Sequence, residues 1–175
     1  TVASLYGRNN LHEIVKKTIE EVFVPITVAG GIRNFEDAKK LIVSGADKIS
    51  LNSALIENPK LLDELSEKIG SSNITVSIEA KKINDDDWEV FTLNGRERSN
   101  INILRWIETI NRYNFGEILL TSIDQDGTKK GFDYQLIELV KKNTHVPLIA
   151  SGGFGKLEHL DELLSVSKVE GIAIG

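Results

Sequence analysis

The chain has 175 residues, of which 41% are hydrophobic, and a formal net charge of −5 at pH 7. This length allows one well-buried domain, and an acidic balance without a basic stripe argues against nucleic acid as the main partner. The absence of cysteine excludes a disulfide framework and a thiolate metal site, and no apolar run reaches the roughly 18 residues of a membrane span. Because the sequence starts with neither a signal peptide nor a plausible initiator, we expect a fragment of a cytoplasmic protein without a membrane partner.

Segments typical of strands and helices alternate along the whole chain. Apolar residues at helical spacing predict helices, and β-branched runs bounded by Pro or Gly predict strands. Asn34 is expected to cap the second helix and Gly45 to end it, and an Asn94-Gly95 turn predicts a hairpin. In chain order we expect helix 10–22, strand 26–29, helix 35–44, strand 48–52, helix 59–69, strand 74–80, hairpin 81–98, helix 101–112, strand 117–123, helix 134–142, strand 148–151, helix 157–164 and strand 171–174.

One segment occurs twice. Residues 24–32 return as residues 146–154, and each copy is expected to be a strand, a Gly-Gly turn, a helix and a second strand. Strict alternation implies a parallel sheet, and the repeat favours a (βα)8 TIM barrel of two related halves over an open doubly wound sheet. A complete barrel needs about 250 residues. We therefore expect a single barrel domain over 1–175 that is an incomplete interior portion, roughly strands 3 to 8 with flanks.

The two Gly-Gly turns predict two phosphate sites. Glycine lets the backbone approach a ligand, and the N–H groups at a helix start attract anions. Two such turns at matched positions of a repeat strengthen the prediction. The predicted phosphate and substrate groups are Gly30, Gly31, Asn52 and Ser53 in the first copy, and Ser151, Gly152 and Gly153 in the second.

The densest polar cluster, residues 121–128, follows a predicted strand. Its candidate substrate-binding residues are Thr121, Gly127 and Thr128, and Asp126 is a candidate catalytic group, although Asp126-Gly127 is also an ordinary turn pair. Glu79 ends a neighbouring strand on its polar face. A carboxylate there can act as general acid or base, so Glu79 and Asp126 are expected to face one cavity.

Two charges begin their strands. Lys48 and Glu117 lie on the polar strand faces, at the end expected to form the barrel bottom. Burial of either charge alone is costly, which favours pairing across the barrel axis. Two readings stay open, namely a structural salt bridge and a charged gate to a hydrated channel.

The remaining polar residues predict no further chemistry. The three histidines, His12, His145 and His159, do not cluster and are expected to be surface or structural residues. Residues 85–87 are expected to form a solvated acidic turn. We expect no metal and no cofactor.

Residues 45–53, 116–128, 149–153 and 155–159 are similar to the cyclase subunit family of imidazole glycerol phosphate synthase, a (βα)8 barrel. The resemblance extends over nearly the whole chain, and a sister isomerase family shares the half-barrel repeat. It implies a glutaminase partner that supplies ammonia, and closure and cleavage of a bis-phosphorylated ribulosyl substrate to imidazole glycerol phosphate and an aminoimidazole carboxamide nucleotide. By position, Lys48 and Glu117 match the family's channel entrance and Asp47 a partner contact.

The chain also departs from that family. The family pairs an Asp on the first strand with an Asp on the fifth, whereas the fifth-strand position here is Glu79, and one extra methylene moves the carboxylate by roughly 1.5 Å. Glu79, residues 4–9 and residues 94–98 resemble a paralogous branch of surface-polysaccharide clusters, in which ammonia is thought to amidinate an acetamido sugar. A third hypothesis is a non-catalytic phosphate-binding subunit that regulates a glutaminase.

Overall fold

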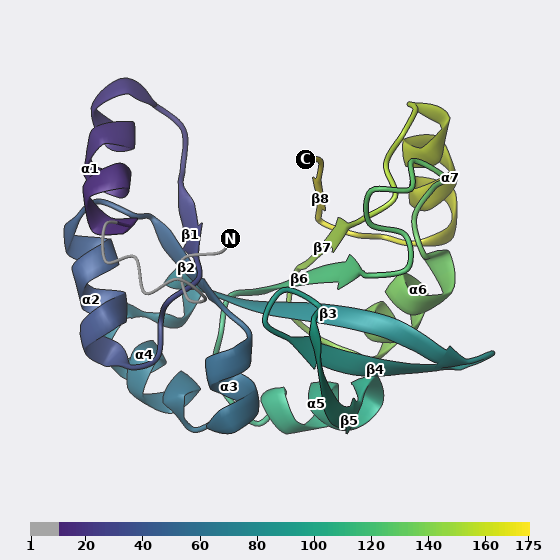
Figure 1. The fold of residues 1–175 in the computed structure, drawn as a ribbon, viewed down its shortest axis with the longest axis horizontal. Helices are drawn as coiled ribbons and strands as arrows, with labels where there is room; N and C mark the ends of the chain where they lie inside the picture. The colour runs from purple at the N-terminus through teal and green to yellow at the C-terminus, as the bar shows by residue number, and fades with distance from the viewer. Residues whose placement is uncertain (1–10) are drawn as a thin grey trace. The chain divides into compact units, whose positions relative to one another are not determined.

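The computed structural model describes residues 11–175, in which most strands are followed by a helix (Figure 1). The chain folds as two compact units. The first runs to Val76 and includes 113–116, and the second contains 77–112 and 117–175. No helix in residues 11–175 is long and apolar enough to cross a bilayer.

The first unit is a parallel β-structure with helical connections. Its strands pair in the order β1-β2-β3, with Val28 opposite Ile49 and Leu51 opposite Val76. Its core contains fully buried Leu55. The elements are α1 (Leu11–Glu21), β1 (Thr27–Ala29), α2 (Phe35–Val43), β2 (Lys48–Leu51), α3 (Ser53–Glu57), α4 (Leu61–Ile69), the 3-10 turn η2 (Ser71–Asn73) and the start of β3 (Ile74–Asn84).

The second unit continues β3 and repeats the alternation. Strands β6, β7 and β8 are parallel, and β3 lies beside β6, where the Ile123 N–H donates to the Ala80 carbonyl at 2.8 Å. Helix α5 contacts β4 and β5. The remaining elements are β4 (Asp87–Thr92), β5 (Glu97–Asn102), α5 (Ile103–Ile110), β6 (Glu117–Ser122), α6 (Tyr134–Asn143), β7 (Leu148–Ser151), α7 (Glu158–Val166) and β8 (Gly171–Ala173).

The predicted alternation of strand faces is confirmed for β3. Ile74, Val76 and Ile78 of β3 are fully buried, whereas Ser77 and Glu79, with the opposite parity, are half-buried. Alternation of side chains across a strand requires this pattern when one face packs under helices. Thr75 is an exception, since it is buried although it lies on the polar face.

The segment between β3 and α5 differs most from the prediction. Strand β3 continues to Asn84, and the predicted hairpin is formed by β4 and β5, which runs to Asn102 instead of ending at residue 98. The predicted helix start at 101 is wrong because Asn102 is the N-cap of α5, its side chain accepting from the Leu104 and Arg105 N–H groups. The two residues before Ile103 belong to β5, with Ile101 opposite Val90.

Smaller differences concern helix ends. Helix α3 was not predicted, and α4 begins at Leu61, after a tight turn in which the Leu62 N–H donates to the Pro59 carbonyl at 3.1 Å. The Asn34 cap is confirmed, since its side chain accepts the Asp37 N–H at 3.0 Å. The start of the first predicted helix, residue 10, lies outside the described residues.

Candidate functional site

Glu79 lies on β3 in the second unit, opposite Phe91 of β4. Its Oε2 accepts the backbone N–H of Gly95 at 2.8 Å. Gly95 has φ +74° and belongs to the turn between β4 and β5, as the Asn94-Gly95 pair predicted. A donated N–H stabilises the ionised form of a carboxylate and fixes its orientation. The turn therefore positions the candidate acid/base.

Asp126 lies in the loop after β6, and its N–H donates to the Ser122 carbonyl at 2.9 Å. The Asp126 side chain is exposed. Because β3 and β6 are neighbours, the two candidate carboxylates come from adjacent strands. That Glu79 and Asp126 line one cavity stays a prediction.

The loop after β6 is held by hydrogen bonds within the loop and to strand β3. The Thr128 hydroxyl donates to the Gln125 carbonyl at 2.8 Å, and Asp124 Oδ2 accepts the Lys82 N–H of β3 at 2.7 Å. Thr121 is half-buried at the end of β6, whereas Gly127 and Thr128 are exposed. The predicted substrate-binding cluster is therefore a hydrogen-bonded turn whose residues Gly127 and Thr128 are exposed to solvent.

The second glycine turn packs against the end of this loop. Gly152 and Gly153 have φ +93° and +101°, and Ser151 before them is half-buried at the end of β7. The Gly131 N–H donates to the Gly153 carbonyl at 2.8 Å. A Cβ on Gly153 would collide with the Gly131 carbonyl oxygen, so this position requires glycine for packing as well as conformation.

The first glycine turn is more open. Gly30 and Gly31 have φ +98° and +75°, and a Cβ on Gly31 would meet no atom within 4 Å. Asn52 is the N-cap residue of α3 and Ser53 its first residue. The sequence placed Asn52 at the end of a strand, so the helix that follows at once was missed. Both glycine turns lie between a strand and a helix, as predicted.

The predicted channel and partner residues lie at strand starts. Lys48 begins β2 in the first unit and Glu117 begins β6 in the second, and both are half-buried. An ion pair between them remains a prediction. Asp47 has a structural contact, because its Oδ2 accepts the Ile26 N–H at 2.7 Å.

The repeat contains the same carboxylate contact a second time. Glu170 Oε2 accepts the Leu148 N–H at 2.8 Å, and Lys141 Nζ donates to its Oε1 at 2.6 Å. Partial burial, the largest influence, raises the pKa of Glu170, but the Lys141 and Leu148 donors outweigh it and leave this pKa below its usual value. Asp47 and Glu170 thus each join the starts of two neighbouring strands.

A polar centre at Asp133 was missed. Its Oδ2 accepts from Trp88 Nε1 at 3.1 Å and from the Ser122 hydroxyl at 3.2 Å, while Oδ1 caps α6 through the Leu136 N–H. The sequence indicates only one part of this centre, the helix cap. An Asp before a helix predicts a cap, but the partners on β4 and β6 are distant in sequence.

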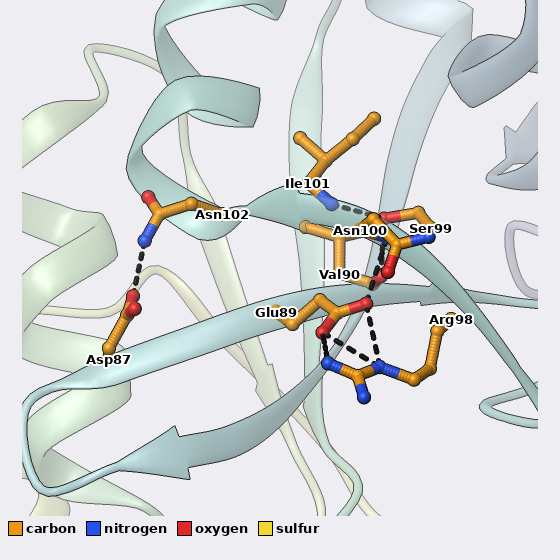
Figure 2. Close-up of polar contacts among 8 residues, drawn as sticks. All are labelled: Asp87, Glu89, Val90, Arg98, Ser99, Asn100, Ile101 and Asn102. Carbon is orange, nitrogen blue, oxygen red and sulfur yellow. Dashed lines mark hydrogen bonds and ion pairs between the residues drawn. The ribbon is translucent and has the colours of Figure 1, made fainter.

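The ion pair of the β4–β5 hairpin was also missed (Figure 2). Glu89 is 3% exposed, and its carboxylate accepts from Arg98 Nη2 at 2.5 Å and from the Asn100 N–H at 2.8 Å. The Arg98 hydrogen bond holds the pKa of Glu89 below its usual value, although burial opposes it. Asp87, predicted as part of a solvated turn, instead begins β4 and accepts a hydrogen bond from Asn102.

The structure describes the side chains of two of the three histidines. His145 is exposed and His159 is buried, while the side chain of His12 lies outside the described residues. His159 Nδ1 accepts the Gly155 N–H at 3.2 Å, a structural contact. Residues 4–9, which carried part of the resemblance to the paralogous branch, also lie outside the described residues.

Comparison with known proteins places these features in a family. The model of the family described as "Histidine biosynthesis protein" matches residues 2–175. The chain is 52% identical, over 92% of its length, to the imidazole glycerol phosphate synthase subunit HisF of Legionella pneumophila, and covers 76% of that protein. Subunits of the same name from Hydrogenobaculum sp. (strain Y04AAS1) and Bacillus cereus (strain ATCC 10987 / NRS 248) are 43% and 44% identical over 95% and 94% of the chain, which spans 66% and 65% of their lengths.

Proposed function

Since the chain belongs to the histidine biosynthesis protein family, whose members share the (βα)8 barrel, we propose that it is the cyclase part of imidazole glycerol phosphate synthase. The proposed reaction uses ammonia to convert a bis-phosphorylated ribulosyl aminoimidazole carboxamide nucleotide into imidazole glycerol phosphate and an aminoimidazole carboxamide nucleotide. The observation that carries the proposal is 52% identity to a subunit named HisF over 92% of the chain.

The two glycine turns supply the binding part of the mechanism. Each turn follows a strand and precedes a helix, so its N–H groups and the helix dipole favour one terminal phosphate. Gly30 and Gly31 would take one phosphate and Gly152 and Gly153 the other. An anchored phosphate would hold the substrate in a fixed orientation, which lowers the entropy cost of ring closure.

Glu79 supplies the proton transfer in this proposal. Its carboxylate accepts the Gly95 N–H at 2.8 Å, which fixes its orientation, and in the proposed reaction it accepts a proton from the attacking nitrogen and returns it to the leaving group. Asp126, in the loop after the neighbouring strand, assists in this proposal. Glu79 lies in β3 after the residues that pair in parallel with β2, and Asp126 follows the end of β6. Barrel enzymes carry their chemistry at the carboxyl ends of their parallel strands.

The relatives are named as subunits of a synthase, which supports a partner subunit for this chain. We assign that partner as a glutaminase that delivers ammonia from the end of the strands where Asp47, Lys48 and Glu117 lie. Ammonia would enter past the Lys48 and Glu117 charges. We place the complex in the cytoplasm.

The test is turnover of the bis-phosphorylated ribulosyl substrate by the intact polypeptide with an ammonium salt. We expect Glu79→Ala and Asp126→Ala each to lower kcat by roughly 100- to 10,000-fold, because general acid–base groups contribute that much. Glu108→Gln, in an exposed pair with Arg112 on α5, is the control and should leave kcat unchanged. Turnover that survives both alanine variants would reject the proposed roles.

The sugar-modifying paralogue is the second candidate, and one contact favours it. The Glu79–Gly95 hydrogen bond joins the two described features that resemble that branch, the Glu at the fifth-strand position and residues 94–98. Glu79→Asp separates the candidates, since a gain in cyclase turnover would favour the paralogue and a loss would favour the cyclase.

The non-catalytic alternative predicts a different result. If the chain only regulates a glutaminase, Glu79→Ala and Asp126→Ala would leave every measured activity unchanged, and stimulation of the glutaminase would persist. A glutaminase assay with the partner subunit and each variant decides this point.

A further inference from the structure

Both glycine turns are followed by a side chain that reaches back to the turn. In the second unit, His159 Nδ1 accepts the Gly155 N–H at 3.2 Å. In the first unit, Asp37 Oδ2 accepts the Arg33 N–H at 3.1 Å. In each case the acceptor lies four residues after the donor and within the first turn of the following helix.

These two contacts occupy the same place in the repeat. The same spacing of 122 positions separates the glycines, the donors and the acceptors of the two copies. These pairs are Gly30 and Gly152, Arg33 and Gly155, and Asp37 and His159. The residue types differ, since one acceptor is a carboxylate and the other an imidazole. The hydrogen bond has therefore been kept while the chemistry of the acceptor changed, which indicates that the bond itself matters at both turns.

The environment of His159 shows what its bond holds. The ring is 5% exposed, and its Cδ2 lies 3.7 Å from where a Cβ on Gly131 would be. Gly131 in turn donates to the Gly153 carbonyl. The ring thus accepts a backbone N–H two residues after the glycine turn and lies close to Gly131, at the end of the loop after β6. Acceptance at Nδ1 requires the proton of the neutral ring to be on Nε2.

Asp37 is part of a reciprocal arrangement. Its own N–H donates to the Asn34 side chain at 3.0 Å while its carboxylate accepts from Arg33. Such exchange resembles a capping box, which by itself only stabilises a helix start. Here the accepted N–H belongs to the turn before the cap, so the bond also fixes the backbone that leads from Gly31 into the helix.

We propose that Asp37 and His159 are matched positioning residues, which hold the two glycine turns in the conformation that binds the substrate phosphates. The inference rests on the proposed function only in assigning phosphate to these turns. Backbone N–H groups bind an anion well only when they already point toward it, because ordering a loose turn reduces the affinity. Neither side chain has to touch the ligand.

The variants at His159 separate the hydrogen bond from the rest of the side chain. In His159→Asn, Oδ1 takes the place of Nδ1 and can still accept the Gly155 N–H, whereas His159→Leu fills the space without an acceptor. We expect the leucine variant to raise KM for the bis-phosphorylated substrate roughly 3- to 10-fold, since one hydrogen bond accounts for about that ratio, with kcat within about twofold. The asparagine variant should restore KM, and exposed His145→Leu is the control.

Binding of inorganic phosphate, followed by calorimetry on the intact polypeptide, gives a readout that needs no turnover. The leucine variant should bind phosphate more weakly, and the asparagine variant should bind it as the unmodified protein does. If the protein binds phosphate in this pattern but does not turn over the nucleotide, the proposed reaction fails and the positioning role stands. If the protein binds no phosphate, the positioning role is rejected.

Two further results would overturn the inference. One is a lower melting temperature in His159→Leu with unchanged KM and phosphate affinity, because that is the result for a helix cap alone. The other is equal damage from leucine and asparagine. If His159→Leu fails to fold, the same test is made at Asp37, which is half-buried. We expect Asp37→Leu to weaken phosphate binding and Asp37→Asn to retain it.

Discussion

At the scale of single residues, the clearest electrostatic arrangement is the Glu89 carboxylate. Its side chain is 4% exposed, whereas its partner Arg98 is 62% exposed. The guanidinium and the Asn100 N–H supply the hydrogen bonds that the carboxylate would otherwise lack on burial. The pKa of Glu89 is lowered by Arg98, which means that folding favours the ionised form.

We expect Arg98→Met to lower the melting temperature at pH 7 by several degrees. A depressed carboxyl pKa stabilises the fold above the pKa of the unfolded chain, and this contribution is lost as the pH falls through the lower folded pKa. The difference between the unmodified protein and Arg98→Met should therefore shrink below about pH 4. Thermal unfolding from pH 3 to pH 8 measures it.

The matching control for this pair is Arg112→Met, which removes an arginine from an ion pair exposed on both sides, at 70% and 72%. Exposed helix pairs contribute little, so its melting temperature should hardly change. A pH-independent loss in Arg98→Met would contradict the electrostatic account and favour lost packing of the arginine stem.

At the scale of elements, the two glycine turns have the same place in the repeat and different surroundings. Both need positive φ at each glycine. Only the second turn packs against another loop, through Gly153 and Gly131, whereas Gly31 faces open space. The same sequence pattern therefore gives one open turn and one that is part of a packed structure.

Alanine substitutions should reveal this difference. Gly31→Ala is expected to reduce the free energy of unfolding by about 1–2 kcal/mol, the usual cost of a left-handed conformation with a Cβ. Gly153→Ala adds overpacking against the Gly131 carbonyl oxygen, and we expect a loss of more than about 3 kcal/mol. Urea unfolding measures the free energy of unfolding of both variants. Equal losses would show that the loop at Gly131 moves aside without a measurable energetic cost.

At the scale of the whole molecule, the repeat extends to individual hydrogen bonds. Asp47 and Glu170 accept the backbone N–H groups of Ile26 and Leu148, residues that are equivalent in the two copies. The return contacts also agree, since the N–H groups of Asp47 and Glu170 both donate at 3.0 Å to the carbonyls of Ile26 and Leu148. Each copy thus closes the start of its strand pair in the same way.

We expect Asp47→Ala and Glu170→Ala each to lower the free energy of unfolding by about 0.5–1.5 kcal/mol, the net value of one hydrogen bond. Asp47→Asn retains an acceptor oxygen and should lose less. Lys141→Met removes the ion pair of Glu170 without its backbone contact, and serves as the control. Denaturant unfolding of all four variants tests this, and no loss in either alanine variant would contradict a stabilising role.

The sequence predicted the parallel strands and most helices because their signals are local. Helix α6 and strand β7 begin where predicted, at Tyr134 and Leu148, since an Asp cap and a Pro mark their starts. The region from Lys81 to Asn102 was harder. Whether its residues extend a strand or begin a helix depended on pairing between β3, β4 and β5, which no local pattern contains.

The sequence by itself determined the family, the βα alternation, the repeated glycine turns and the neighbouring strands that carry Glu79 and Asp126. These follow from periodicity, positive-φ turns and motifs, all of which operate over a few residues. Only the tertiary structure decided that Gly95 donates to Glu79, that Asp133 joins β4 and β6 to α6, and that His159 accepts the Gly155 N–H after the second glycine turn. The Glu79–Gly95 bond and the bonds of Asp133 to Ser122 and Trp88 join residues 11 to 45 positions apart, beyond the reach of local patterns. The His159–Gly155 bond spans only four positions, but it depends on how the turn packs against Gly131.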